Sequence, residues 1–88
     1  NLSFFSKELE IDELEIIYYL NEYKEISFQE YLNFLRISFV SMKIEQNYLK
    51  DHSIKELAEV AGFSDRTRLE KTFKKIINCN LQEYIAHV

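Results

Sequence analysis

Apolar side chains recur every three or four residues along almost the whole chain, and polar side chains fill the positions between them. This spacing places the apolar residues on one face of a helix, so it predicts a series of amphipathic helices. The expected inward-facing residues are, in chain order, Leu2, Phe5 and Leu9; Ile16, Tyr19, Leu20 and Tyr23; Phe28, Tyr31, Leu32, Leu35, Phe39 and Met42; Ile54, Leu57, Ala58 and Ala61; Leu69, Phe73 and Ile76 or Ile77; and Leu81, Tyr84 and Ile85.

Polar residues between these stripes mark where helices start and stop. Four pairs have the spacing of a capping box, in which a polar N-cap side chain is followed three residues later by Glu. They are Asp12 with Glu15, Ser27 with Glu30, Ser53 with Glu56, and Asn80 with Glu83. Ser27 is expected to open a long helix that runs to about Tyr48. Gly62 is expected to end the following short helix in the left-handed conformation, and Asp65 to start the next one.

The chain also repeats itself once. The segment Phe28-Gln29-Glu30-Tyr31-Leu32 returns as Leu81-Gln82-Glu83-Tyr84-Ile85, and residues 2–20 match residues 54–73 at nearly the same offset. Two copies indicate a duplicated unit rather than a solenoid. Each unit contains a short helix, a tight turn and a second helix, which is the helix-turn-helix pattern. A generic helical bundle remains the alternative at this point.

Length and composition favour one all-α domain. The chain has 88 residues, 47% of them apolar, with no proline and one glycine, so a sandwich or barrel rich in turns is not expected. The single cysteine, Cys79, excludes an internal disulfide and suits a reducing cytoplasm. We see no signal peptide and no run of about 20 apolar residues. Because the chain starts at Asn1, we expect it to be part of a longer protein.

The charge distribution is uneven along the chain. The net charge is −4, which opposes nucleic-acid binding because such binding depends on the neutralisation of phosphates. Residues 1–50 hold five basic and nine acidic residues, whereas residues 51–88 hold six of each. The second half is therefore the more favourable one for DNA, and its basic residues are clustered.

Residues 53–66, Ser-Ile-Lys-Glu-Leu-Ala-Glu-Val-Ala-Gly-Phe-Ser-Asp-Arg, are followed by Leu69, Phe73-Lys74-Lys75 and Glu83-Tyr84-Ile85. Together they resemble the second half of the DNA-binding domain of the AraC/XylS family of bacterial transcription regulators. Upstream, Glu30-Tyr31-Leu32 and Leu35-Arg36-Ile37 are similar to the linker helix of that family. The resemblance extends over essentially all 88 residues and is weak in the first 20.

The resemblance implies two helix-turn-helix subdomains joined by a long linker helix. The first unit would occupy residues 1–26, the linker helix residues 27–49 and the second unit residues 50–88. We expect the effector or dimerisation domain that usually precedes this unit in the family to be absent from this chain. The chain departs from the family pattern at Glu25 and Asn78, where the family has glycine, at Leu81, where it has proline, and at Val40, where it has a small residue.

The expected second recognition helix, from Asp65 to about Ile77, carries the basic cluster. By resemblance, the family reads bases at the positions of Arg66, Thr67 and Lys71, while Arg68, Lys74 and Lys75 suit contacts to phosphates. Arginine is suited to guanine O6 and N7, and threonine to a thymine methyl. Glu70 is expected either to accept from cytosine N4 or to lie at the edge of the contact. A solvated basic helix face is the bland alternative.

The first recognition helix is expected to present Glu13, Leu14, Ile17, Tyr18 and Asn21, with no basic residue before Lys24. Weak DNA contact is one interpretation of this face. The alternative function is a protein-interaction module of the same fold with weakened DNA binding, which docks through Leu14, Ile17 and Tyr18.

We expect no enzyme, because no nucleophile and base are paired and no Gly-rich loop is present. His52, His87 and Cys79 lack the spacing of a metal site, so we expect neither a metal nor another cofactor. The resemblance implies double-stranded promoter DNA as the partner, RNA polymerase as a partner of the intact regulator, a homodimer formed through the missing domain, no membrane contact and a cytoplasmic location.

Overall fold

The structure is a computed structural model that describes residues 2–10, 12 and 28–88. In chain order its elements are α1 (Leu2–Leu9), α3 (Phe28–Glu45), the 3-10 helix η1 (Tyr48–Lys50), α4 (Ile54–Ala61), α5 (Arg66–Ile77) and α6 (Leu81–Ala86). Within these described ranges the fold is all-α and contains no strand, as predicted. None of the helices described is both long enough and apolar enough to cross a membrane.

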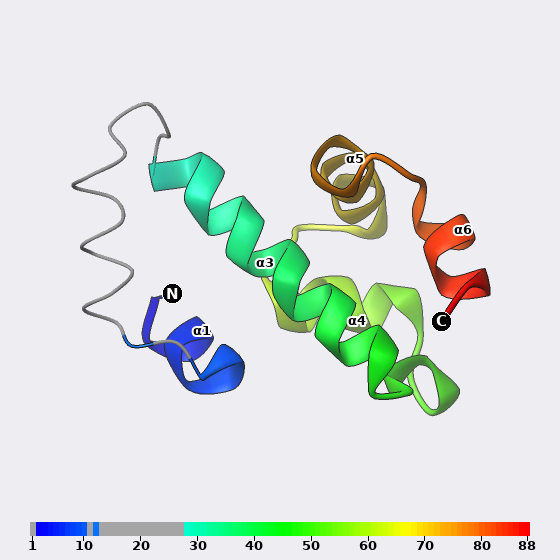
Figure 1. Cartoon of the computed structure of the whole chain (residues 1–88), viewed down its shortest axis with the longest axis horizontal. Helices are drawn as coiled ribbons and strands as arrows, with labels where there is room; N and C mark the ends of the chain where they lie inside the picture. The colour runs from blue at the N-terminus through cyan, green and yellow to red at the C-terminus, as the bar shows by residue number, and fades with distance from the viewer. Residues whose placement is uncertain (1, 11, 13–27) are drawn as a thin grey trace.

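The longest helix, α3, runs through the middle of the molecule, and the other helices pack around it. It contacts α1 on one side and α4 and α5 on the other, and Figure 1 shows this arrangement, with α6 beyond α5 at the C-terminal end. Its 18 residues form about five turns.

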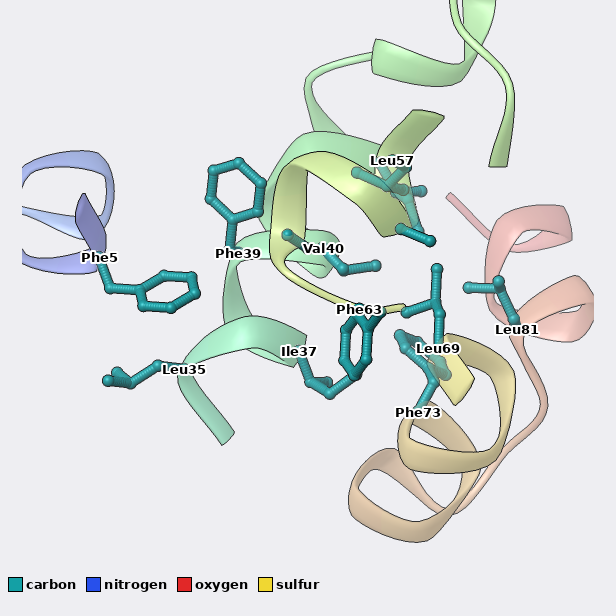
Figure 2. Packing of buried hydrophobic residues seen from close by; sticks show 13 residues of the cluster. Phe5, Leu35, Ile37, Phe39, Val40, Leu57, Phe63, Leu69, Phe73 and Leu81 are labelled. Carbon is teal, nitrogen blue, oxygen red and sulfur yellow. The ribbon is translucent and has the colours of Figure 1, made fainter. Parts of the chain in front are cut away.

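The core is built on two opposite faces of α3. Leu35 and Phe39 lie on the same side as Phe5 of α1, whereas Ile37 and Val40 lie on the side of α4 and α5 (Figure 2). All of these side chains are buried, as is Ile44. Phe39 is in aromatic contact with both Phe4 and Phe5, with ring centroids 5.3 and 6.2 Å apart.

The predicted single stripe on this helix was therefore wrong in part. Phe28 was expected to face inward, but 54% of its surface is exposed. Tyr31, Leu32 and Met42 are half-buried and pack against the edge of the core. A helix with neighbours on two sides needs two apolar faces, and one periodic stripe describes only one of them.

The end of α3 also differs from the prediction. The helix stops at Glu45, about three residues before the expected end near Tyr48. Asn47 adopts the left-handed conformation, with φ 64° and ψ 29°, and the chain continues as η1. Asparagine tolerates this backbone conformation better than most residues do, which explains the position of the break.

The shorter helices follow the sequence prediction closely. Leu57, Ala58 and Ala61 of α4 are buried, and Ile54 packs against the same core. In α5, Leu69 and Phe73 are fully buried, and Ile76 rather than Ile77 supplies the third inward position. Leu81 is the buried residue of α6, with Tyr84 and Ile85 half-buried beside it. Cys79 is partly buried and packs against this core as a free thiol.

The capping predictions can be compared with hydrogen bonds at two of the four sites. At Ser53, Oγ accepts from the Glu56 backbone N–H and the Glu56 carboxylate accepts from the Ser53 N–H, so both bonds of the capping box are present. These bonds, with the Ser53 backbone N–H as the main cause, hold the pKa of Glu56 below its usual value of 4.5.

At Asn80 the cap differs in detail from a capping box. Its Oδ1 accepts from the Glu83 backbone N–H at 2.8 Å, as expected of an N-cap. The Glu83 carboxylate, however, accepts from the side-chain amide of Asn80 and so closes the pair through side chains. The pairs expected at Asp12 and Ser27 involve Glu15 and Ser27, which lie outside the described residues.

Candidate nucleic-acid interface

A four-residue turn connects α4 to α5 and sets the direction of α5. Gly62 ends α4 in the left-handed conformation, with φ 97° and ψ 14°, as predicted. Its N–H donates to the carbonyls of Ala58 and Glu59, and the next N–H, that of Phe63, donates to Ala58 at 2.9 Å. Phe63 is buried. This apolar anchor, two residues after the end of α4, fixes the path of the chain into α5.

Arg36 of α3 packs against this turn. Its guanidinium carbon lies 5.9 Å from the centroid of the Phe63 ring, in cation–π geometry. Nη1 of the same side chain donates to Asn33 at 3.0 Å, which holds the guanidinium in place. A Cβ atom at Gly62 would lie 3.2 Å from Nε of Arg36, so the two residues are close-packed. The turn is therefore attached to α3 as well as to α4.

Two polar residues define the ends of α5. Asp65 is the N-cap, and its carboxylate accepts from the backbone N–H of Arg68 at 2.8 Å. Asn78 closes the other end in the left-handed conformation, with φ 69° and ψ 22°, and its N–H donates to Lys74. Asparagine tolerates this left-handed conformation, so it can close the helix in place of glycine.

The two faces of α5 differ sharply in chemistry. Leu69 and Phe73 are completely buried. The other face carries the basic side chains, all of them exposed: Arg66, Arg68, Lys71, Lys74 and Lys75. With one acidic residue, Glu70, the helix has a net charge of +4, whereas the whole chain has −4. The helix thus packs on the core through its apolar face and presents a strongly positive face to solvent.

The predicted base-contacting and phosphate-contacting residues all lie on this exposed surface, but only some of them are brought together. A groove of about 730 Å³ runs between α5 and the start of α6. Its lining residues are Arg66, Glu70, Lys71, Lys74, Lys75, Asn80, Leu81 and Gln82. Thr67 and Arg68 are exposed as well, but they lie outside this groove.

The side of the groove formed by α6 is anchored to the rest of the molecule. The Tyr84 ring stacks on Phe73 with centroids 5.2 Å apart, and the Tyr84 hydroxyl donates to Glu45 at the end of α3, at 3.0 Å. Partial burial, reinforced by the bond to the Glu45 carboxylate, raises the pKa of the Tyr84 hydroxyl. These contacts fix α6 beside α5.

Glu70 forms an ion pair that the sequence analysis did not foresee. Its Oε1 lies 2.7 Å from Nε of Arg66, one helical turn away. The signal was present in the sequence, since opposite charges four residues apart on a helix are neighbours. Asn80 and Gln82 were not predicted at the groove, because their approach to α5 depends on the packing of α6 rather than on any local pattern.

The residues expected on the first recognition helix are not among those that the structure describes. They are Glu13, Leu14, Ile17, Tyr18 and Asn21.

Comparisons of the chain with known protein families, with curated proteins and with solved structures found no match. Among the residues that the structure describes, no three His, Cys, Asp or Glu side chains are grouped so that they could hold a metal ion.

Proposed function

We propose that this chain binds double-stranded DNA sequence-specifically, as the DNA-binding domain of an AraC-type transcription regulator. In this proposal α4, the turn and α5 form a helix-turn-helix unit, and α5 enters the major groove. The observation that carries the proposal is the exposed basic face of α5, which is opposite a fully buried apolar face. The resemblance of residues 53–85 to that family supports the same function.

The dimensions of α5 suit this role. An α-helix with its side chains is about 10–12 Å across, and the major groove of B-DNA is about 12 Å wide. The 12 residues of α5 extend about 18 Å, which places side chains from several turns within reach of successive base pairs. In the proposed arrangement Arg66, Thr67 and Lys71 contact bases, while Arg68, Lys74 and Lys75 contact phosphates.

The acidic net charge of the chain does not oppose this proposal, because charges act locally at physiological ionic strength. The Debye length at 0.15 M salt is about 8 Å, so exposed charges farther away are largely screened. The charge closest to a duplex docked on α5 is the +4 of that helix. The larger acidic excess lies in residues 1–50, which hold nine of the 15 acidic residues.

The internal repeat extends the proposal to a second unit. By its match to residues 54–73, the segment of residues 2–20 supplies a further helix-turn-helix unit, and α3 joins the two. The recognition helix of that unit lies outside the described residues, so the proposal rests on α5. In the intact cytoplasmic regulator, the family resemblance adds RNA polymerase and a second copy of the protein as partners.

Salt-dependent binding to random-sequence duplex DNA tests this function. We expect fluorescence anisotropy to show an affinity that falls as salt rises, with a slope that reports several phosphates. Lys74→Ala should weaken binding to all duplexes similarly and reduce the slope by about one, because it removes one phosphate contact. Lys50→Ala is the matched control, since Lys50 is also exposed but belongs to η1.

Two results would contradict the proposal. One is the absence of binding even at low salt. The other is an equal loss of affinity in Lys50→Ala and Lys74→Ala, which would mean that DNA responds to overall charge and not to the basic face of α5.

A further inference from the structure

Glu70 is the single acidic residue of α5, and it faces the same groove as Arg66, Lys71 and Lys74. Its carboxylate binds Nε of Arg66 at 2.7 Å, and the two side chains are 40% and 50% exposed, respectively. A carboxylate at this place would repel a nearby phosphate. Its partner arginine neutralises that charge.

Stability of the helix is a poor explanation for the pair. Exposed ion pairs four residues apart contribute little to folding, because water and salt screen them and both side chains lose freedom. The chain also has Asp65 as an N-cap and two buried anchors to hold α5 in place. The pair is therefore better explained by the effect of Glu70 on the orientation of the Arg66 side chain than by helix stability.

The atom that Glu70 binds leaves the end of the guanidinium available. The bond occupies Nε, and the terminal groups Nη1 and Nη2 are not part of it. Those two groups form the fork that fits two acceptors at once, as guanine presents with O6 and N7 in the major groove. The bond at Nε biases the long side chain toward one orientation before DNA arrives, which lowers part of the entropic cost of the contact.

We propose that Glu70 is a positioning residue that holds Arg66 in the orientation for reading guanine. The preferred DNA partner of this site is then a duplex with a G·C pair opposite Arg66. This inference rests on the proposed DNA-binding function and adds to it the base that one position requires. It also replaces the expectation that Glu70 itself accepts from cytosine.

Two substitutions at Glu70 separate the effect of its hydrogen bond to Arg66 from the effect of its negative charge. Glu70→Gln and Glu70→Ala remove the same negative charge, so both should raise the affinity for random-sequence duplex DNA to a similar extent. Only glutamine keeps an oxygen that can accept from Nε of Arg66. A difference in base preference between these two variants therefore reports the hydrogen bond to Arg66 and not the charge.

The experiment selects preferred sequences from a pool of randomised duplexes with the 88-residue chain, and then measures competition by duplexes changed at single base pairs. We expect the original chain to prefer guanine at one position by about tenfold, and Arg66→Ala to lose that preference. Glu70→Ala should reduce it at least threefold at the same position, and Glu70→Gln should retain most of it. Circular dichroism checks that each variant keeps its helix content.

Each other outcome overturns the inference in a distinguishable way. An unchanged guanine preference in Glu70→Ala would show that Glu70 does not position Arg66, while the DNA-binding function would stand. A cytosine preference that survives Arg66→Ala but disappears in both Glu70 variants would show that Glu70 contacts the base directly. Failure of the original chain to bind any duplex would overturn the inference together with the proposed function.

Discussion

Arg36 and Gly62 meet where α3 packs against the turn that leads into α5. The close packing leaves room for a glycine, and the left-handed backbone at this residue favours one. Asn78 takes the same backbone conformation at the end of α5 with a side chain in place. Glu10, directly after α1, also has a positive φ of 56°. The left-handed backbone at a helix end is thus compatible with a side chain in this molecule, whereas at Gly62 a Cβ atom would also approach Arg36.

Substitution of Gly62 tests which of these two constraints matters more. Gly62→Ala should lower the free energy of unfolding by about 1–2 kcal/mol, because alanine resists the left-handed conformation. Gly62→Asn adds the same Cβ atom near Arg36 but tolerates that conformation, so its cost should be smaller. Urea unfolding followed by circular dichroism measures both. Equal losses would show that the contact with Arg36, and not the backbone conformation, requires glycine.

At the residue scale, the features that were predicted correctly are those that depend on residues close together in the sequence. Ser53, Asp65 and Gly62 were assigned to helix ends from spacing alone, and each makes the backbone contacts expected of its position. The contact of Arg36 with the turn was not predicted, because it joins residues 26 positions apart and depends on how α3 packs. The Arg66–Glu70 pair was within reach of the sequence, since it follows from helical spacing.

At the scale of elements, α3 is the part of the fold that the sequence described least well. Its two buried faces hold separate groups of residues: Leu35 and Phe39 toward α1, and Ile37 and Val40 on the opposite side. Short helices such as α4 and α5 touch the core on one side, so one stripe predicts them. A central helix lacks a polar face over part of its length, and its neighbours cannot be assigned from periodicity.

The two faces of α3 should respond separately to mild substitutions. Phe39→Leu removes aromatic contacts with Phe4 and Phe5 and should cost roughly 1–2 kcal/mol. Hydrogen exchange should then accelerate most at the amides of α1. Ile37→Val, on the opposite face, is the matched control and should cost about 1 kcal/mol, with faster exchange in α5 instead. Equal acceleration of both helices in both variants would contradict the separation of the two faces.

At the scale of the whole molecule, charge is the property that divides the chain. The 88 residues carry a net charge of −4, whereas α5 alone carries +4. The net charge alone opposes nucleic-acid binding, and the proposed function rests instead on where the positive charges lie. The proposed function therefore depends on where α5 is held, and the contacts of α3, the turn and α6 hold it with its basic face outward.

The most direct test of the central claim maps the surface that meets DNA. In an NMR titration of the isotope-labelled chain with duplex DNA at low salt, we expect the largest amide shifts in residues 65–75, with small shifts in α1. The same titration at high salt should abolish these shifts, because the contacts release counterions. Shifts concentrated in α1 or at the start of α3, with α5 unchanged, would contradict the claim that α5 is the DNA-reading helix.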